Sequence, residues 1–145
     1  MTTVQHCILG KGAKVFSIGS DDTVENALTM MRDNRIRSVM VIDMGKLVGI
    51  LSQGDCAIKV LLPGKSAAST SVASVMTKNP LTVSYDNTLE ECMAIMDLKR
   101  IRHLPVLHNG QVTGLISIGD IVKNMMSDQD SQIKFLETYI RGHGV

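Results

Sequence analysis

The chain of 145 residues carries 15 lysines and arginines against 14 aspartates and glutamates, a formal net charge of +1. With charges so nearly balanced, the protein has no overall positive electrostatic field to attract a nucleic-acid backbone or an anionic membrane. Its two Phe, two Tyr and no Trp offer few aromatic rings for stacking single-stranded bases. With no basic leader at the start and no apolar run near the roughly 18 residues of a membrane span, we expect a soluble, cytoplasmic protein that binds neither nucleic acid nor membrane.

The first half of the chain predicts a short leading helix and then the order strand, helix, strand, strand, helix. The helix after the first strand has cap candidates up to Thr23 and apolar residues at helical spacing as far as Asn34. The next two strands are continuous apolar runs, typical of strands covered on both faces, and the turn between them contains Gly45. The expected ranges are residues 3–9 (helix), 15–18 (strand), 23–34 (helix), 39–42 and 47–51 (strands) and 52–61 (helix), then a Gly-, Ser- and Ala-rich linker to residue 70.

The second half repeats this order. Thr88-Leu89-Glu90-Glu91 has the spacing of a capping box, and Asn109-Gly110 is a strong signal for a hairpin turn. The expected ranges are residues 72–76 (helical turn), 81–83 (strand), 88–99 (helix), 104–107 and 112–116 (strands), a helix from Ser117, and a terminal helix after Ser127-Asp128 that carries Ile133, Leu136 and Ile140.

An internal repeat accounts for this recurrence. Gly45 to Asp55 reads GKLVGILSQGD, and Gly110 to Asp120, 65 positions later, reads GQVTGLISIGD. The same register pairs Arg35-Ile36-Arg37 with Arg100-Ile101-Arg102, so the chain contains two copies of one sequence unit.

The repeat also predicts the domain organisation. We expect a division into residues 1–70, with the leading helix and the first repeat, and residues 71–145, with the second repeat and the terminal helix. Each half is marginal alone at about 60 residues. We therefore expect an α/β fold of two β-α-β-β-α repeats related by an internal pseudo-two-fold, with their sheets packed against each other.

Both copies end in a Ser-x-x-Asp motif, Ser52 to Asp55 and Ser117 to Asp120. One interpretation is a helix cap, in which the serine hydroxyl and the aspartate satisfy backbone amides of the first turn. The other is a ligand site, because a carboxylate there could accept both hydroxyls of a ribose. Gly49 and Gly114 interrupt the preceding strands, which indicates close approach of another backbone or of a ligand.

The repeated order of elements, the paired Gly-h-h-Ser-x-x-Asp endings (h is apolar) and the run from Arg100 to Val106, RIRHLPV, resemble the CBS domain. Over residues 11–126 the chain resembles a stand-alone, bacterial-type tandem CBS pair, or Bateman module, of the kind that acts in signal transduction. This resemblance implies two clefts between the repeats that bind adenosine-containing ligands such as AMP, ADP, ATP, S-adenosylmethionine or NAD(H). It also implies a regulatory function in which the bound nucleotide favours one arrangement of the repeats and signals to an unidentified partner protein.

The resemblance also implies the site residues. Asp55 and Asp120 would hold ribose diols, with Ser52 and Ser117 beside them. The apolar residues expected to border adenine rings are Phe16, Ile36, Met76, Leu81 and Ile101. The basic residues expected to face phosphates are Arg37, Arg102 and His103. A simpler interpretation of the arginines, as a solvated helix end, stays open.

The first copy departs from the pattern of the family. Gln53, Gly54 and Ile58 stand where relatives often carry an acidic–basic pair and a further arginine. This weakens the expectation of polyphosphate binding there, unless Lys59 and Lys65 substitute.

Two other functions stay open. A structural or oligomerisation module would keep the repeats and bind no nucleotide. A thiol-linked redox regulator would use Cys56, next to Asp55, and would need a thiol pKa well below the usual value of about 8.5. The odd number and wide spacing of Cys7, Cys56 and Cys92 argue against a disulfide framework or a structural zinc site.

We expect no catalysis, because the sequence contains no evident nucleophile–base pair, metal cluster or matched pair of carboxylates.

We do expect a homodimer. Helix faces carrying Met30, Met93 and Met96, together with the apolar face of the terminal helix, exceed what a monomer comfortably exposes.

Overall fold

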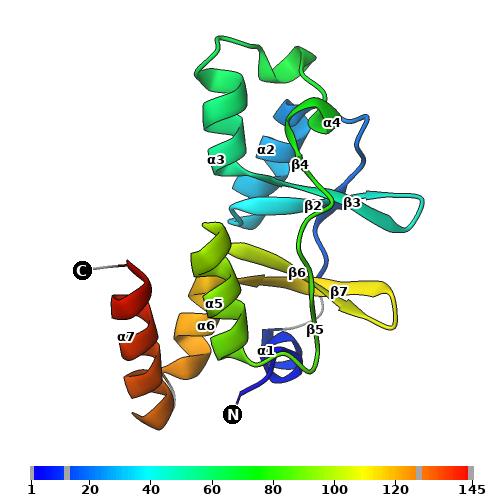
Figure 1. The fold of residues 1–145 in the computed structure, drawn as a ribbon. Helices are drawn as coiled ribbons and strands as arrows, with labels where there is room; N and C mark the ends of the chain where they lie inside the picture. Colours follow the sequence, from blue (N-terminus) through cyan, green and yellow to red (C-terminus); the bar gives the residue numbers. More distant parts are fainter. Residues whose placement is uncertain (1, 12–13, 127–128, 144–145) are drawn as a thin grey trace. The chain divides into compact units, whose positions relative to one another are not determined.

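The computed structural model describes residues 2–11, 14–126 and 129–143 (Figure 1). The chain forms two compact units, which we call the first-repeat unit, Val15–Pro80, and the second-repeat unit, Met1–Lys14 with Leu81–Val145. These units do not coincide with a division at residue 70, because the N-terminal segment joins the second repeat and residues 71–80 join the first.

The first-repeat unit is built on a four-stranded sheet in the order β1-β2-β3-β4. β1 runs parallel to β2, and the β2–β3 and β3–β4 pairs are antiparallel. Its elements are β1 (Ser17–Ile18), α2 (Val24–Asn34), β2 (Ser38–Asp43), β3 (Lys46–Ser52), α3 (Gln53–Cys56), the π-helical η1 (Ala57–Leu61), the 3₁₀-helical η2 (Ala67–Ser69), α4 (Val72–Val75) and β4 (Thr77–Lys78). The predicted order of elements is confirmed, and β4 is an addition.

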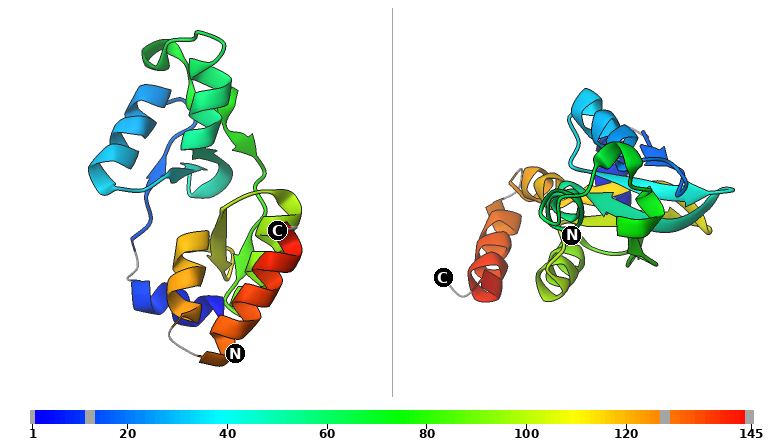
Figure 2. Two further views of the ribbon diagram at one scale, coloured as in Figure 1. Left: turned by 90° about the vertical axis from the view of Figure 1, so that its left-hand side faces the viewer. Right: turned by 90° about the horizontal axis from the view of Figure 1, so that it is seen from above.

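The second-repeat unit is built on a three-stranded sheet in the order β5-β6-β7, with β5 parallel to β6 and β6 antiparallel to β7. Its elements are α1 (Val4–Lys11), β5 (Val83–Ser84), α5 (Leu89–Lys99), β6 (His103–His108), β7 (Gln111–Ser117), α6 (Ile118–Met125) and α7 (Gln129–His143). α7 contacts both α5 and α6 (Figures 1 and 2). The predicted break before this terminal helix, at residues 127–128, lies outside the described residues.

The two hairpins share one geometry. Their two-residue turns have positive φ at both positions, 50° and 78° at Met44-Gly45 and 52° and 76° at Asn109-Gly110, which is the backbone of a type I′ turn. Each hairpin has a register shift at the same place, after Val41 in one and Val106 in the other. The two copies of the sequence repeat therefore have the same backbone conformation in their hairpins.

Short helices complete both units in equivalent positions. In the first-repeat unit the Val72 amide of α4 donates to the Asp22 carbonyl at 2.8 Å, and in the second-repeat unit the Val4 amide of α1 donates to the Asn87 carbonyl at 2.8 Å. The residues before these helices form β-bridges to the N-caps of α2 and α5 in the same way, Ser71 to Thr23 and Thr3 to Thr88. α1 is thus the counterpart of α4, although it precedes the first repeat in the sequence.

Residues in or just after these short helices pack closely against the two glycines in the strands, Gly49 and Gly114. A Cβ at Gly49 would lie 2.5 Å from Met76 Sδ and 3.0 Å from the Thr77 carbonyl oxygen, and a Cβ at Gly114 would lie 2.9 Å from Ile8 Cδ1. The expected approach of another backbone is confirmed at Gly49, whereas at Gly114 the neighbour is a side chain, that of Ile8. Neither glycine requires a ligand.

Each unit has its own apolar core, and the second core corrects one prediction. Met93 and Met96 are each only 3% exposed and pack with Cys92, Leu104 and other core residues of the second-repeat unit. The expectation that they form an exposed helix face was wrong, because this side of α5 is needed for the unit's own core. Met30 is partly buried against the core of the first-repeat unit.

Candidate functional site

Both Ser-x-x-Asp motifs form helix caps. The Asp55 amide donates to Ser52 Oγ at 3.1 Å and the Ser52 amide donates to Asp55 Oδ2 at 3.1 Å. The same pair of bonds joins Asp120 to Ser117 at 3.1 Å and Ser117 to Asp120 Oδ2 at 2.8 Å. The capping interpretation is therefore confirmed, and it fixes each carboxylate at the junction of a strand and a helix.

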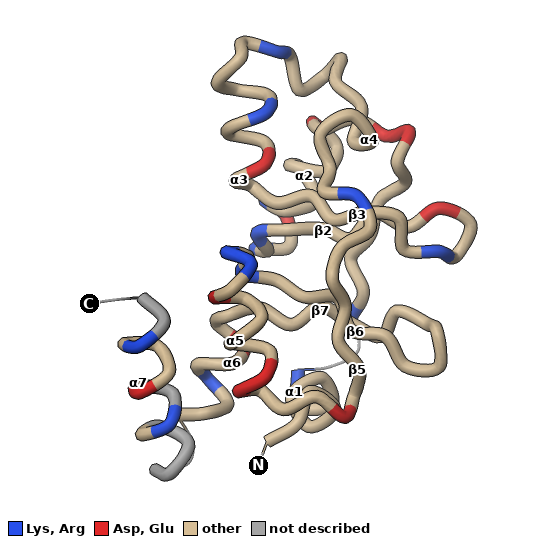
Figure 3. Tube along the Cα trace, in the orientation of Figure 1, with Lys and Arg blue, Asp and Glu red and all other residues tan. Residues whose placement is uncertain are grey.

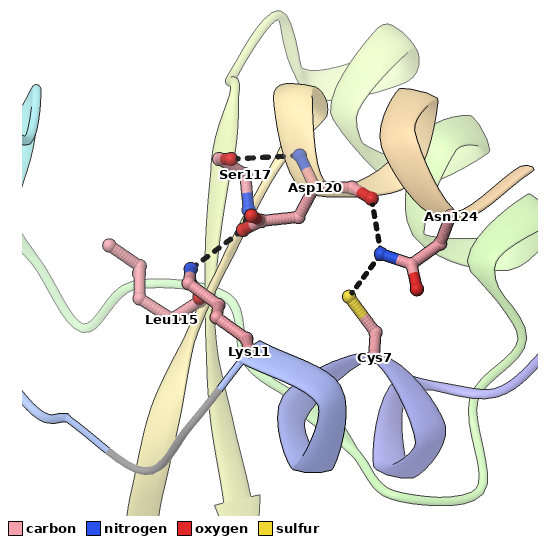
Figure 4. Close-up of polar contacts among 6 residues, drawn as sticks. All are labelled: Cys7, Lys11, Leu115, Ser117, Asp120 and Asn124. Carbon is pink, nitrogen blue, oxygen red and sulfur yellow. Dashed lines mark hydrogen bonds and ion pairs between the residues drawn. The ribbon is translucent and has the colours of Figure 1, made fainter. Parts of the chain in front are cut away.

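The Asp120 carboxylate is also engaged by a lysine from α1 (Figure 4). Lys11 Nζ donates to Asp120 Oδ2 and to the Leu115 carbonyl, both at 2.7 Å. Asp120 Oδ2 therefore accepts from both Lys11 and Ser117, while within the described part of the chain no hydrogen bond reaches Oδ1. That second oxygen remains open to an incoming hydroxyl donor.

The surroundings of Asp120 favour its ionised form. Burial raises the pKa of the carboxyl, but the hydrogen bond and charge of Lys11 and the bonds from Ser117 lower it more, so that the pKa lies below its ordinary value of 3.8. An ionised carboxylate only accepts hydrogen bonds, which suits it to hydroxyl groups.

Asp55 differs from Asp120 in how its oxygens are used. Oδ2 accepts from the Ser52 amide, and Oδ1 lies 3.3 Å from Lys59 Nζ, one turn further along the same helical segment. Lys59 Nζ also donates to the Val75 carbonyl at 3.1 Å. Both Asp55 oxygens thus have protein partners, and Lys59, one of the two lysines considered as substitutes for the missing basic residues, is paired with the motif carboxylate.

The basic segments lie beside the motif of their own unit. The Gln53 amide donates to the Arg37 carbonyl and the Ile118 amide donates to the Arg102 carbonyl, each at 3.0 Å. His103 is the cross-strand partner of Ser117. Arg37 and Arg102 are exposed and form no ion pair within the described ranges, whereas His103 is half-buried.

The neighbouring arginines Arg35 and Arg100 have another backbone role. They are the left-handed C-caps of α2 and α5, with φ of 53° and 56°. The helix-end interpretation therefore holds for this pair. It leaves Arg37 and Arg102 as the arginines next to the motifs.

The residues expected to border adenine are distributed over the two units. Ile36 and Met76 pack at the edge of the first-repeat core, and Ile101 packs at the edge of the second. Phe16 is half-buried and Leu81 is 46% exposed. Each motif aspartate thus shares its unit with partly exposed apolar side chains.

The cysteines do not have the properties of reactive thiols. Cys56 is 5% exposed, and burial, followed by the charge of Asp55, raises its pKa. Burial also raises the pKa of Cys92, to about 12. The low thiol pKa that a regulator acting through Cys56 requires is contradicted.

Lys11 is the site residue that sequence reasoning missed. It lies outside the duplicated segment, and its contact with Asp120 joins residues 109 positions apart. Its neighbourhood is polar: Asn124 Nδ2 donates to the Asp120 carbonyl at 2.7 Å and to Cys7 Sγ at 3.3 Å (Figure 4). No local pattern in the sequence signals such a contact.

Two classes of site are not found in the described part of the chain. It contains no group of three or more His, Cys, Asp or Glu side chains placed to hold a metal ion. None of the described helices is long and apolar enough to cross a membrane. Basic and acidic positions are interspersed along the trace of each unit (Figure 3).

Comparison with known proteins gives consistent matches. A family model described as CBS domain matches residues 12–61 and 72–127. The protein named "CBS domain-containing protein CBSX3, mitochondrial" from Arabidopsis thaliana is 31% identical over 128 residues, 85% of this chain and 62% of that protein. The chain covers 20% of another Arabidopsis relative, CBSCBSPB2, so it spans less than two thirds of the length of both.

Solved structures show the same likeness. A putative signal-transduction protein with CBS domains from Burkholderia ambifaria is 37% identical, with a TM-score of 0.85 over 88% of this chain and 96% of that one. A CBS domain pair solved in complex with 5′-methylthioadenosine and S-adenosyl-L-methionine has a TM-score of 0.78 over 88% of this chain and 98% of that one. At 23% identity, this second likeness concerns the fold alone.

Proposed function

Because the chain belongs to the CBS-domain family and contains two CBS repeats, we propose that it is a regulatory module that binds an adenosine-containing ligand through Asp120 and Asp55. AMP is the simplest such ligand, and other adenine nucleotides and NAD(H) carry the same adenosine group. The module acts by ligand-dependent contact with a partner protein and not by catalysis.

The observation that carries this proposal is the Asp120 carboxylate. It is ionised, rigidly oriented by the Ser117 cap, and has Oδ1 open beside a bound Oδ2. Vicinal ribose hydroxyls are donors with the spacing to meet such a group, and charge-assisted bonds of this kind are the strong ones. The adjacent Arg102 provides the charge that a phosphate requires, and Ile101 provides an apolar surface for a base.

The comparison with solved structures supports the same ligand class. Both molecules in the CBS pair complex, 5′-methylthioadenosine and S-adenosyl-L-methionine, contain adenosine. A diol at Asp120 that uses Oδ2 as well as Oδ1 competes with Lys11, whose other bond is to the Leu115 carbonyl. Ligand binding would therefore loosen Lys11 at the end of α1. This change would transmit the binding event from the ligand to the surface of the unit.

We propose further that Asp120 is the stronger of the two sites. Asp55 has Lys59 beside Oδ1 and the Ser52 amide on Oδ2, so a ribose hydroxyl that binds Oδ1 must displace Lys59. At Asp120 the first hydroxyl can bind Oδ1 without displacing Lys11.

Replacement of Asp120 by asparagine tests this assignment. Asp120→Asn keeps an oxygen that can accept from the Ser117 amide, so the cap is kept, but it removes the charge. We expect AMP affinity measured by calorimetry to fall by roughly ten- to a hundredfold. Asp86→Asn, at an exposed position of the same unit, is the matched control and should leave affinity unchanged.

Equal AMP affinity in Asp120→Asn and the wild type would contradict the assignment. A wild-type protein with no measurable affinity for any adenine nucleotide would instead favour the structural or oligomerisation module. That alternative has one observation in its favour, the apolar residues exposed on α7, Ile133, Leu136 and Ile140.

A further inference from the structure

The second-repeat unit contains a cavity of about 450 Å³ where α5, α6 and α7 meet. Among the described residues, its lining comes from α5, the segment Arg100 to Arg102 that follows α5, α6 and α7. The volume is within the range of pockets that hold small organic molecules, roughly 300 to 1,000 Å³. α7 contacts both α5 and α6 (Figure 2).

The wall of this cavity combines charge with apolar surface. Among the described residues that line it, Arg100 and Arg102 stand beside one carboxylate residue, Asp97, so cationic groups are in excess there. Neither arginine forms an ion pair within the parts of the chain that the structure describes. Met93 and Val122 are among its apolar residues.

We propose that this cavity is a second small-molecule site, which takes an organic anion with an apolar body. An arginine recognises a carboxylate, sulfonate or phosphate group through paired N–H donors, and the methionine and valine side chains bury the apolar part. Pockets of this mixed kind, mainly apolar with a few convergent polar groups, are the usual form of ligand sites.

This site shares Ile101 and Arg102 with the proposed adenosine site but differs from it in its other residues. Thr138 and Tyr139 of α7 contribute to its wall, and α7 follows the last residue, 127, that the CBS family model matches. A ligand there would therefore contact both the second repeat and a helix outside the repeats. Asp120, which carries the proposed ribose contact, is not among the residues that line it.

The fluorescent probe 8-anilinonaphthalene-1-sulfonate tests the proposal, because it is itself an apolar body with one anionic group. We expect saturable binding to the full chain, weakened about tenfold or more by Arg100→Gln. Arg35→Gln is the matched control, since Arg35 is the equivalent left-handed C-cap of the other unit and lies outside the cavity. It should leave probe binding unchanged.

Two further arms separate the possible outcomes. Asp120→Asn should bind the probe as the wild type does, so failure of the adenosine proposal and failure of this one are distinguishable. Octanoate and phenyl phosphate should displace the probe, and their relative strength tells which anionic group is preferred. The uncharged 1-octanol should displace it at least about tenfold less effectively.

A filling substitution gives an independent readout. Val122→Trp places an indole in the cavity and should abolish probe binding, whereas Ala57→Trp, at the equivalent position of the first repeat, should not. Equal weakening by Arg100→Gln and Arg35→Gln, or probe binding that survives both Arg100→Gln and Val122→Trp, would overturn the proposal. Displacement by 1-octanol as strong as that by octanoate would overturn the assignment of an anion.

Discussion

Lys11 determines how much of the Asp120 carboxylate a ligand can reach. It donates to one oxygen of the carboxylate and also to the Leu115 carbonyl, so two hydrogen bonds hold the lysine in place. The first-repeat unit reaches a similar arrangement from a different position, with Lys59 bound to Asp55 and to the Val75 carbonyl. Each motif aspartate is thus paired with a lysine that also binds a backbone carbonyl.

The Lys11–Asp120 pair predicts a pH-dependent contribution to stability. The pKa of Asp120 is lowered in the folded chain, so the pair stabilises the fold above the unfolded value near 3.8 and loses its effect as the pH falls through the folded value. The two side chains are 41% and 21% exposed, which limits the effect through screening. We expect Lys11→Met to lower the free energy of unfolding at pH 7 by roughly 0.5 to 1 kcal/mol.

Urea unfolding at pH 7, 4 and 2.5 measures this effect. The difference between Lys11→Met and the wild type should shrink below pH 4 and approach zero once Asp120 is protonated. Lys14→Met, at an exposed lysine with no ion pair in the described part of the chain, should show no such pH dependence. A difference that stays constant from pH 7 to 2.5 would mean that the Asp120 charge is not involved.

At the scale of elements, the short helices α1 and α4 have the same role in the two units. Ile8 of α1 packs on Gly114 of β7, and Met76, just after α4, packs on Gly49 of β3. The fit differs, because a Cβ at Gly49 also meets a backbone oxygen, that of Thr77, while a Cβ at Gly114 meets only the end of an isoleucine side chain.

This difference predicts unequal costs for the two alanine substitutions. Gly49→Ala should lower the free energy of unfolding by roughly 1 to 3 kcal/mol, since the Thr77 backbone cannot move aside easily. Gly114→Ala should cost less, and adding Ile8→Val, which removes Cδ1, should recover part of that cost in a double-mutant cycle. Equal costs for both glycines, or no coupling between Gly114 and Ile8, would contradict this account of the strand glycines.

The elements that the sequence predicted well are those with local signals. Thr23 and Thr88 cap their helices as expected, and Asn109-Gly110 forms the expected hairpin turn. β4 has two residues, too few to show a strand periodicity, and its partner β3 lies more than twenty residues earlier in the chain.

The candidate site was predictable only where it is local. The capping bonds of Ser117 and Asp120 follow from their spacing, and the position of Arg102 beside them follows from the hairpin. The role of Lys11 and the burial of Met93 depend on packing between elements far apart in the chain. Periodicity places Met93 on a helix but does not tell which face the core will take.

At the scale of the whole molecule, we predict a homodimer. The apolar residues exposed on α7 are Ile133 at 57%, Leu136 at 54% and Ile140 at 53%, and their spacing places them on one face of the helix. Contiguous apolar surface of this kind is typical of an interface. Sedimentation should show a species of twice the 15.8 kDa chain mass at tens of micromolar.

Substitution of this face gives the control. Changing the three residues to serine should dissociate the dimer, whereas Leu98→Ser, at a leucine of α5 that is 77% exposed, should not. A wild type that sediments only as a monomer of 15.8 kDa at these concentrations would contradict the prediction.

Recognition of a ribose diol by Asp120 is the central claim, and calorimetry with AMP and 2′-deoxy-AMP on the wild type tests it most directly. The two ligands have the same base and the same charge, and they differ in one hydroxyl. Loss of one charge-assisted hydrogen bond is expected to weaken binding by roughly tenfold or more. The account predicts that AMP binds and that 2′-deoxy-AMP binds at least about tenfold more weakly, whereas equal affinity for the two would show that the diol is not recognised.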